Sequence, residues 1–233
     1  MDMVIRSLVG GVSDRIPVKT VLISVFDKTG LDAFVPELIK ATPNILFLST
    51  GCTYKTLQRI LDNDRGKHLM EVSEYTGFPE MEGGLVKTLH PRIHAGILGE
   101  RNNPAHQIYL ESLGSASFID LVIVNLYPFE QVIARDLAFE EARGNIDIGG
   151  PTMVRGAAKN FPSCAVIIDP KDYAATLQHL QKNGGCTTLN YRLSLMPKAF
   201  AYTAKYDEVI ADFMANQAVG NKTAVLGRYG LKR

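Results

Sequence analysis

The apolar positions of the chain form short, nearly continuous runs that alternate with amphipathic segments. Residues 18–25 (VKTVLISV) are rich in β-branched side chains and predict a buried strand, and residues 119–124 (IDLVIV) predict the strongest strand of the chain. Shorter strands are predicted at 45–48, 69–72 and 164–168. Strands that are apolar along their whole length are typical of parallel sheets covered on both faces.

Segments with helical spacing of apolar residues lie between these strands. Helices are predicted at 30–41, 53–62, 105–113, 130–144, 150–161 and 171–182, with one or two more from 188 to about 217. Pro36 predicts that the first of them starts late or is broken in two. The apolar residues within 73–88 fit neither the helical nor the strand period, which predicts a long ordered loop or a binding loop.

The alternation of strands and helices predicts an α/β fold, with a mostly parallel sheet, helices on both faces and a helical C-terminal segment. We expect one domain over residues 18–220, an N-terminal arm over 1–17, and a C-terminal tail over 221–233. Gly10, Gly11 and Asp14 interrupt the apolar start of the chain, so the arm is interpreted as distinct from a signal peptide.

The charge balance limits the classes of partner. With 25 Lys and Arg against 24 Asp and Glu the net charge is +1, so no general attraction to nucleic acid or to an acidic membrane is expected, and any anion site must be local. No apolar run approaches the roughly 20 residues that span a bilayer. Cys52, Cys164 and Cys186 form no CxxC pair, which predicts free thiols in a reducing, cytoplasmic compartment.

Four polar clusters follow predicted strands, where open parallel sheets bind their ligands. The first contains Asp27, Lys28 and Thr29. The second, STGCT at 49–53, leads into a helix whose free N–H groups suit a phosphate. Helix capping by Ser or Thr is the simpler alternative for either cluster alone. Neither matches a Walker loop or a dinucleotide-binding fingerprint, so ATP and NAD sites are not indicated.

The third cluster, LVKTLHPR at 85–92, ends the long loop. Lys87 and Arg92 can neutralise phosphate, and a partly desolvated Lys87 can move protons, although a solvated surface pair is the alternative. His90 and His94 have the i,i+4 spacing of zinc ligands. However, Pro91 disfavours helical geometry at His90 and no HExxH carboxylate is present, so structural histidines are favoured and no metal site is predicted.

The fourth cluster is NLYPF at 125–129, in which the Asn125 amide can read a carboxamide and the Tyr127 hydroxyl can hold a developing oxyanion. A tyrosine packed in a turn is the alternative.

Beyond these clusters, Asp147 precedes a helix that starts near Gly149. It is interpreted as a cap or as a functional carboxylate. Gly149-Gly150, Gly156 and Ala157-Ala158 keep this helix thin and favour a close approach of its backbone to a ligand. On the alternative reading, Arg155 and Lys159 are simply exposed positions.

Together and in this order, the clusters resemble the inosine monophosphate cyclohydrolases, the first domain of a bifunctional purine-biosynthesis family with a methylglyoxal-synthase-like fold. The resemblance runs from about residue 18 to about 220. It is carried by SVFDKTGL, STGCT, EYTGFPEM, LVKTLHPRIHAGIL, NLYPF and NIDIGGPTMVRGAAKN. STGCT alone fits the whole fold family. Residues 226–230 (LGRYG) resemble the start of the formyltransferase domain, so formyl transfer is expected to be absent.

The resemblance implies the last step of de novo purine biosynthesis. The carboxamide nitrogen of a formamido-imidazole-carboxamide ribonucleotide attacks the formyl carbon, and water leaves. Such chemistry needs proton transfer and oxyanion stabilisation, and the resemblance implies no cofactor. It also implies a homodimer that binds a purine ribonucleotide, while the charge balance and the lack of a long apolar run predict neither nucleic acid nor membrane as a partner. A methylglyoxal-synthase-like lyase and a non-catalytic nucleotide-sensing domain are the alternatives.

The same resemblance assigns roles to individual residues. Lys159 is the implied proton donor and acceptor, Asp147 orients the carboxamide, and Tyr127 and Lys87 act at the formyl oxygen. The implied substrate-binding residues are Asp27, Lys28, Thr29, Thr50, Gly51, Cys52, Thr53, Val86, Thr88, Asn125, Leu126, Ile148 and Gly149. Lys159 lies ~15 Å along its predicted helix, so we expect Lys159 and Asp147 to contact different parts of one ligand.

Three positions depart from the family pattern. Phe26 stands where the family usually has Ser, Cys52 where it has Gly, and Leu85 where it has Arg. Phe26 and Leu85 each remove a phosphate contact worth roughly 1.5–3 kcal/mol. We therefore predict retained activity with a raised KM, unless Arg92 or another residue compensates.

Overall fold

A computed structural model describes residues 11–82, 85–114, 116–135 and 138–230. Five strands form a wholly parallel sheet in the order β4-β3-β2-β5-β6. They are β2 (Thr20–Val25), β3 (Leu46–Ser49), β4 (Leu69–Glu71), β5 (Leu121–Asn125) and β6 (Ala165–Ile167). The register pairs Val25 at the end of β2 with Asn125 at the end of β5, so the carboxyl ends of the central strands lie at one edge.

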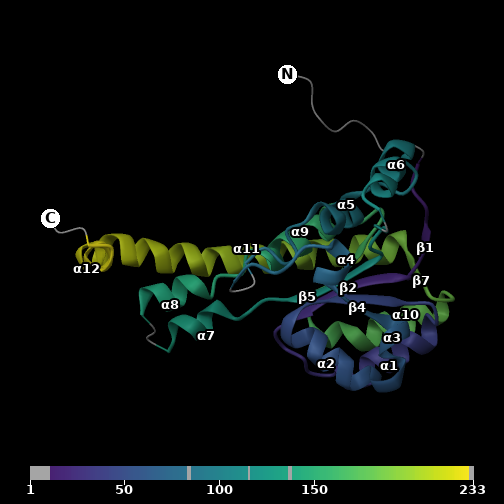
Figure 1. Cartoon of the computed structure of the whole chain (residues 1–233), viewed down its shortest axis with the longest axis horizontal. Helices are drawn as coiled ribbons and strands as arrows, with labels where there is room; N and C mark the ends of the chain where they lie inside the picture. The colour runs from purple at the N-terminus through teal and green to yellow at the C-terminus, as the bar shows by residue number, and fades with distance from the viewer. Residues whose placement is uncertain (1–10, 83–84, 115, 136–137, 231–233) are drawn as a thin grey trace.

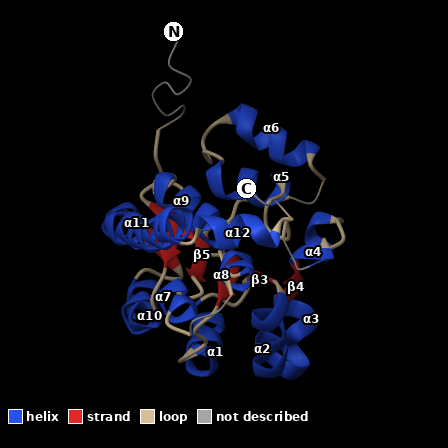
Figure 2. Cartoon of the chain, turned by 90° about the vertical axis from the view of Figure 1, so that its left-hand side faces the viewer, coloured by secondary structure: helices blue, strands red, loops and turns tan. Residues whose placement is uncertain are grey.

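Helices cover both faces of this sheet, as two perpendicular views show (Figures 1 and 2). On one face lie α1 (Leu31–Ala41), α2 (Gly51–Leu61), α3 (Arg65–His68) and α10 (Tyr173–Lys182). On the other lie α5 (Pro91–Leu98), α9 (Gly149–Lys159) and the first part of α11 (Leu189–Gly220). Every residue of β5 is buried, as expected for a strand between two helical layers. The predicted α/β class is confirmed.

The remaining elements are short. They are the helices α4 (Val72–Thr76), α6 (Pro104–Ser112), α7 (Phe129–Ile133), α8 (Phe139–Gly144) and α12 (Lys222–Arg228), the 3-10 turns at Asp62–Asp64 and Pro170–Asp172, and the strands β1 (Arg15–Pro17) and β7 (Cys186–Thr188).

Two prolines lie inside continuous helices. The prediction that Pro36 delays or breaks the first helix is wrong, because α1 runs unbroken from Leu31 to Ala41. Its buried side chains include Phe34 and Leu38, and burial of each is worth ~1.5–3 kcal/mol, enough to offset one lost backbone hydrogen bond. Likewise α11 continues through Pro197 as a single helix of 32 residues.

The small residues of α9 serve its packing. Ala157 and Ala158 are fully buried, and α9 contacts β5, α5 and α11. A Cβ atom at Gly156 would lie 3.2 Å from Cγ2 of Ile97 on α5. The thin part of this helix is therefore explained by close helix packing, whereas the glycines at its start have another role, described below.

Two features near the ends of the chain were not predicted. Strand β1 pairs antiparallel with β7, although Arg15–Pro17 fall in the predicted N-terminal arm. The buried Arg192 guanidinium donates to the main-chain carbonyls of Ser13 and Asp14 and so ties this segment to α11. Residues 1–10 of the predicted arm lie outside the described residues.

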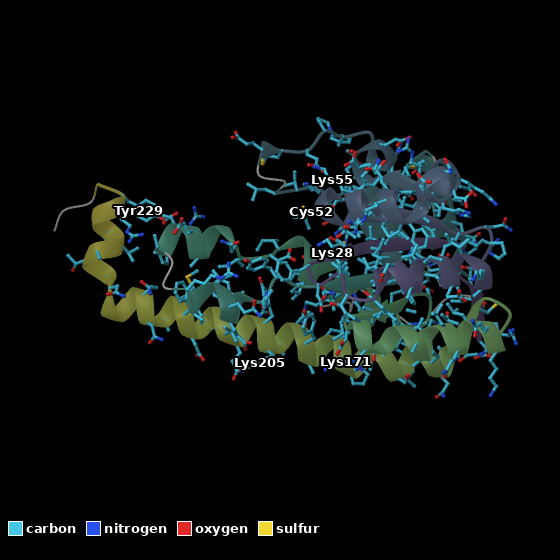
Figure 3. The ribbon with its side chains drawn as sticks, turned by 90° about the horizontal axis from the view of Figure 1, so that it is seen from below. Lys28, Cys52, Lys55, Lys171, Lys205 and Tyr229 are labelled. Carbon is cyan, nitrogen blue, oxygen red and sulfur yellow. The ribbon has the colours of Figure 1, made fainter. Side chains whose placement is uncertain are left out.

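The C-terminal half of α11 extends beyond the sheet, with α7 and α8 beside it and α12 at its far end (Figure 1). The single helix predicted over 130–144 is in fact two helices, α7 and α8. Tyr229, at that far end in Figure 3, donates a hydrogen bond to Glu140 near the start of α8. None of the helices in the described part of the chain is long and apolar enough to cross a membrane.

Candidate active site

Two neighbouring cavities open at the carboxyl edge of the sheet. The smaller, of about 300 Å³, is called the site cavity, and it holds three of the four predicted catalytic residues. Its lining includes Ser24, Thr50, Leu85, Lys87, Thr88, Tyr127, Asp147, Ile148, Gly149 and Met153. Lys87, Tyr127 and Asp147 come from three segments far apart in the sequence. The parallel topology brings them together, as the strand-end rule predicts.

The larger cavity, of about 890 Å³, is called the side groove and runs between the ends of β2, β5 and β6 and helix α11. It takes five of the thirteen predicted substrate-binding residues, namely Asp27, Lys28, Thr29, Asn125 and Leu126, whereas Gly51, Cys52, Thr53 and Val86 line neither cavity. The rings of Phe26 and Tyr127 meet edge to face, 4.3 Å between centroids, and each ring lines one of the two cavities. Phe26 thus forms part of the wall between them.

Lys87 supplies the positive charge of the site cavity. Its ammonium lies 2.7 Å from the Glu80 carboxylate and 3.5 Å from where a Cβ atom at Gly51 would stand. Gly51 has φ +53° and opens helix α2, whose first N–H groups are free for an anion. Lys28 and Cys52 lie at the same edge (Figure 3). An ammonium and a helix N-terminus therefore converge at this point.

Asp147 reaches the cavity from the loop before α9, and one carboxylate oxygen accepts the Gly150 N–H at 2.8 Å. Burial raises the pKa of Asp147, while the Gly150 N–H acts in the opposite direction. A Cβ atom at Gly150 would collide with the Asp147 carboxylate, and one at Gly149 would collide with the Thr88 hydroxyl. Both glycines are thus needed for these side chains to approach α9.

Several predicted substrate-binding side chains are instead occupied by the protein itself. The Thr53 hydroxyl accepts from the Val25 N–H and donates to its carbonyl. The Asn125 amide accepts from the Asp27 N–H and donates to its carbonyl. The Thr53 and Asn125 side chains thus fasten the strand ends, and their part in substrate binding stays a prediction.

Lys28 and Asp27 also stabilise the loop after β2. The Lys28 ammonium donates to the carbonyls of Val25 and Phe26, at 3.1 and 3.0 Å. The Asp27 carboxylate accepts the Thr29 N–H, and the side-chain hydroxyl of Thr29 together with this N–H holds the pKa of Asp27 below its usual range.

The residues around α5 are structural. Arg92 donates to the Tyr75 carbonyl at 2.7 Å and does not line the site cavity, so the suggestion that it replaces the phosphate contact of the missing arginine is wrong. The His90 ring accepts the Arg92 N–H and caps α5, which confirms the structural reading of His90. Among the described residues, no group of three His, Cys, Asp or Glu side chains could hold a metal ion.

Lys159 lies apart from the three other predicted catalytic residues. It is exposed in the last turn of α9, whereas Asp147 precedes the first turn, and it lines neither cavity. An 11-residue helix separates them by ~15 Å. Within one chain the two side chains therefore do not share a cavity.

Sequence reasoning missed three residues at this edge. Glu80 pairs with Lys87, the Tyr202 hydroxyl accepts the Leu126 N–H, and the Tyr206 hydroxyl accepts the Asp147 N–H. The i,i+4 spacing of the two tyrosines places them on one face of α11, but nothing local in the sequence identifies their partners.

Comparison with known proteins gives two family matches. The MGS-like domain family matches residues 31–152, and the AICARFT/IMPCHase bienzyme family matches residues 157–230. These matches confirm the resemblance indicated by the motifs.

Among curated relatives, the bifunctional purine biosynthesis protein PurH of Chlorobaculum parvum is 50% identical over 202 residues, which are 86% of this chain and 37% of that protein. PurH of Rhodospirillum rubrum is 46% identical over 208 residues, 89% of this chain and 38% of that protein. The chain thus spans less than two fifths of the length of these relatives. The crystal structure of ForH aligns with a TM-score of 0.69 at 29% identity, covering 84% of this chain and 99% of that one.

Proposed function

This chain belongs to the family of MGS-like domains, and from that premise we propose that it is an inosine monophosphate cyclohydrolase. The substrate is a 5-formamidoimidazole-4-carboxamide ribonucleotide. Its carboxamide nitrogen bonds to the formyl carbon. The formyl oxygen leaves as water, carrying one proton from the carboxamide nitrogen and one from the formamido nitrogen.

The observation that carries the proposal is the meeting of Lys87, Tyr127 and Asp147 in one cavity of about 300 Å³. An ammonium and a phenol hydroxyl can donate to the formyl oxygen as negative charge develops on it. The half-buried carboxylate of Asp147 can accept an N–H of the attacking carboxamide. The reaction needs donors and an acceptor arranged in this way around one small, planar ligand.

The N-terminus of α2 is proposed to hold the 5′-phosphate. Thr50 and Lys87 both line the cavity, and α2 begins at Gly51 beside the Lys87 ammonium. Free N–H groups and the helix dipole favour an anion there. Because Glu80 also contacts Lys87, the substrate and this carboxylate compete for the same ammonium.

A homodimer is part of the proposal, because Lys159 is exposed and lies ~15 Å from Asp147 along α9. We propose that Lys159 of the partner subunit completes the site. The cytoplasmic location predicted from the cysteines stays a prediction.

The proposal is tested by supplying the formylated ribonucleotide to the purified chain and following inosinate by its absorbance. Turnover that Lys159→Ala abolishes supports the cyclohydrolase. Nucleotide binding without turnover supports a sensing domain instead, and methylglyoxal formed from dihydroxyacetone phosphate supports a lyase.

A further inference from the structure

Helix α11 presents two tyrosine hydroxyls to the candidate active site, four residues apart on one helix face. The Tyr202 hydroxyl lies 2.8 Å from the Leu126 nitrogen, and the Tyr206 hydroxyl lies 2.8 Å from the Asp147 nitrogen. In both bonds the main-chain N–H donates to the hydroxyl. These contacts join residues 76 and 59 positions apart in the sequence, so they are tertiary rather than local.

The two bonds fall in the loops that carry the site residues, one directly after β5 and one just before α9. Leu126 follows Asn125, the last paired residue of β5, and precedes Tyr127. Asp147 precedes the first residue of α9 by two positions. A main-chain N–H at such a place has no partner from a strand ladder or a helix, so a side-chain acceptor decides where the loop lies.

The two hydroxyls are suited to this role because they are rigidly held. Tyr206 is only 8% exposed and Tyr202 is half-buried, and both rings pack against the core. Burial raises the pKa of both phenols, so they stay protonated and neutral at physiological pH. A neutral hydroxyl accepts from an amide without placing a second negative charge beside Asp147.

We infer that Tyr202 and Tyr206 are positioning residues of the cyclohydrolase, which act by fixing the loops that carry Tyr127 and Asp147. This inference rests on the proposed function. It assigns to α11 a part in the reaction, although neither tyrosine lines the site cavity itself and only Tyr202 lines the side groove.

The experiment compares Tyr202→Phe and Tyr206→Phe with Tyr191→Phe. Tyr191 lies on the same helix and its hydroxyl also makes a partly buried bond of 2.8 Å, but to the Thr176 hydroxyl, away from the site. Small displacements of reacting groups are costly, so we expect kcat to fall at least about tenfold in each test variant while KM changes less than about threefold. The control should keep kcat within about twofold, with a similar loss of thermal stability.

A second readout separates this inference from the proposed function. Amide hydrogen exchange at Leu126 and Asp147 should become faster in the corresponding variant and remain unchanged in Tyr191→Phe. If the wild-type chain shows no turnover, the proposed function fails and amide exchange alone decides whether the tyrosines hold the loops. Unchanged exchange, or unchanged kcat in a chain that does turn over, would overturn the inference.

Discussion

The Lys87 ammonium, in the lining of the site cavity, lies 2.7 Å from the Glu80 carboxylate. Both side chains are partly exposed, and such pairs contribute about 0–1 kcal/mol. The contact is therefore weak enough for a phosphorylated substrate to displace, yet it holds Lys87 beside the N-terminus of α2.

Glu80→Gln removes this competing charge. We expect KM for the ribonucleotide to fall up to about fivefold at low salt. The fall should be smaller at high salt, because salt screens the attraction between Glu80 and Lys87 and Glu80 then competes less with the substrate. Steady-state kinetics at two ionic strengths measure the effect. Glu82→Gln, an exposed neighbour in the same loop, is the control. A KM that rises in Glu80→Gln would show that Glu80 supports binding instead.

Leu85→Arg is expected to improve substrate binding. Leu85 lines the site cavity and is 66% exposed, so an arginine there can reach a bound phosphate without disturbing the core. A charged hydrogen bond is worth roughly 1.5–3 kcal/mol, which predicts a KM about tenfold lower or more. Leu98→Arg, which adds the same charge at an exposed position of α5, should leave KM unchanged. Equal effects of the two variants would indicate a general charge effect.

Gly150→Ala is expected to displace Asp147. The added methyl group would meet the Asp147 carboxylate and the Leu126 side chain. Such overpacking costs typically about 1–3 kcal/mol, so we expect a lower melting temperature together with a loss of kcat. Gly66→Ala is the control, because its methyl group would enter open space. Full activity in Gly150→Ala would mean that this contact is unimportant to the site.

The pH dependence follows from the burial of Asp147. Burial raises its pKa, so the carboxylate becomes protonated at a higher pH than an exposed aspartate does, and a neutral carboxyl is a much weaker acceptor for the carboxamide N–H. As pH falls, kcat/KM should decline through an apparent pKa above the ordinary aspartate value of about 4. In Asp147→Asn the low residual activity should no longer show this decline of kcat/KM at low pH, the acid limb of the profile. An unchanged limb would assign it to another group.

Complementation tests whether Lys159 acts across a dimer. Chains carrying Asp147→Asn and chains carrying Lys159→Ala are each expected to keep only a low residual activity. When the two are mixed so that subunits exchange, half of the dimers are mixed, and each mixed dimer has one intact site. Activity should then return to about a quarter of wild type. No recovery, with subunit exchange verified, would require Lys159 to act within its own chain.

The sheet was predictable because its strands carry their signal locally. Residues 119–124 form a run that is apolar except for Asp120, and such a run is favourable only when it is buried. Strand β5 occupies nearly the same residues. The β1–β7 pair was not predictable, because Arg15–Pro17 and Cys186–Thr188 are three residues each and show no clear period. Helix α5 was also missed, although it begins at Pro91, a residue well suited to a first helical turn.

The site was predictable as far as topology determines it. Lys87, Tyr127 and Asp147 share a cavity because polar residues that follow parallel strands, or enter their loops, meet at one edge. The roles of Glu80, Tyr202 and Tyr206 depend on contacts between distant segments, which no local pattern encodes. The separation of Lys159 from Asp147 followed directly from the rise of an α-helix.

The most direct measurement is the rate of inosinate formation from the formylated ribonucleotide by the purified chain and by its Lys87→Ala, Tyr127→Phe and Asp147→Asn variants. The account predicts turnover by the wild-type chain and a loss of kcat of about 10²–10³ for a removed oxyanion donor, while nucleotide binding persists in Tyr127→Phe and Asp147→Asn. A wild-type chain that binds the ribonucleotide and never forms inosinate, or three variants with undiminished kcat, would contradict it.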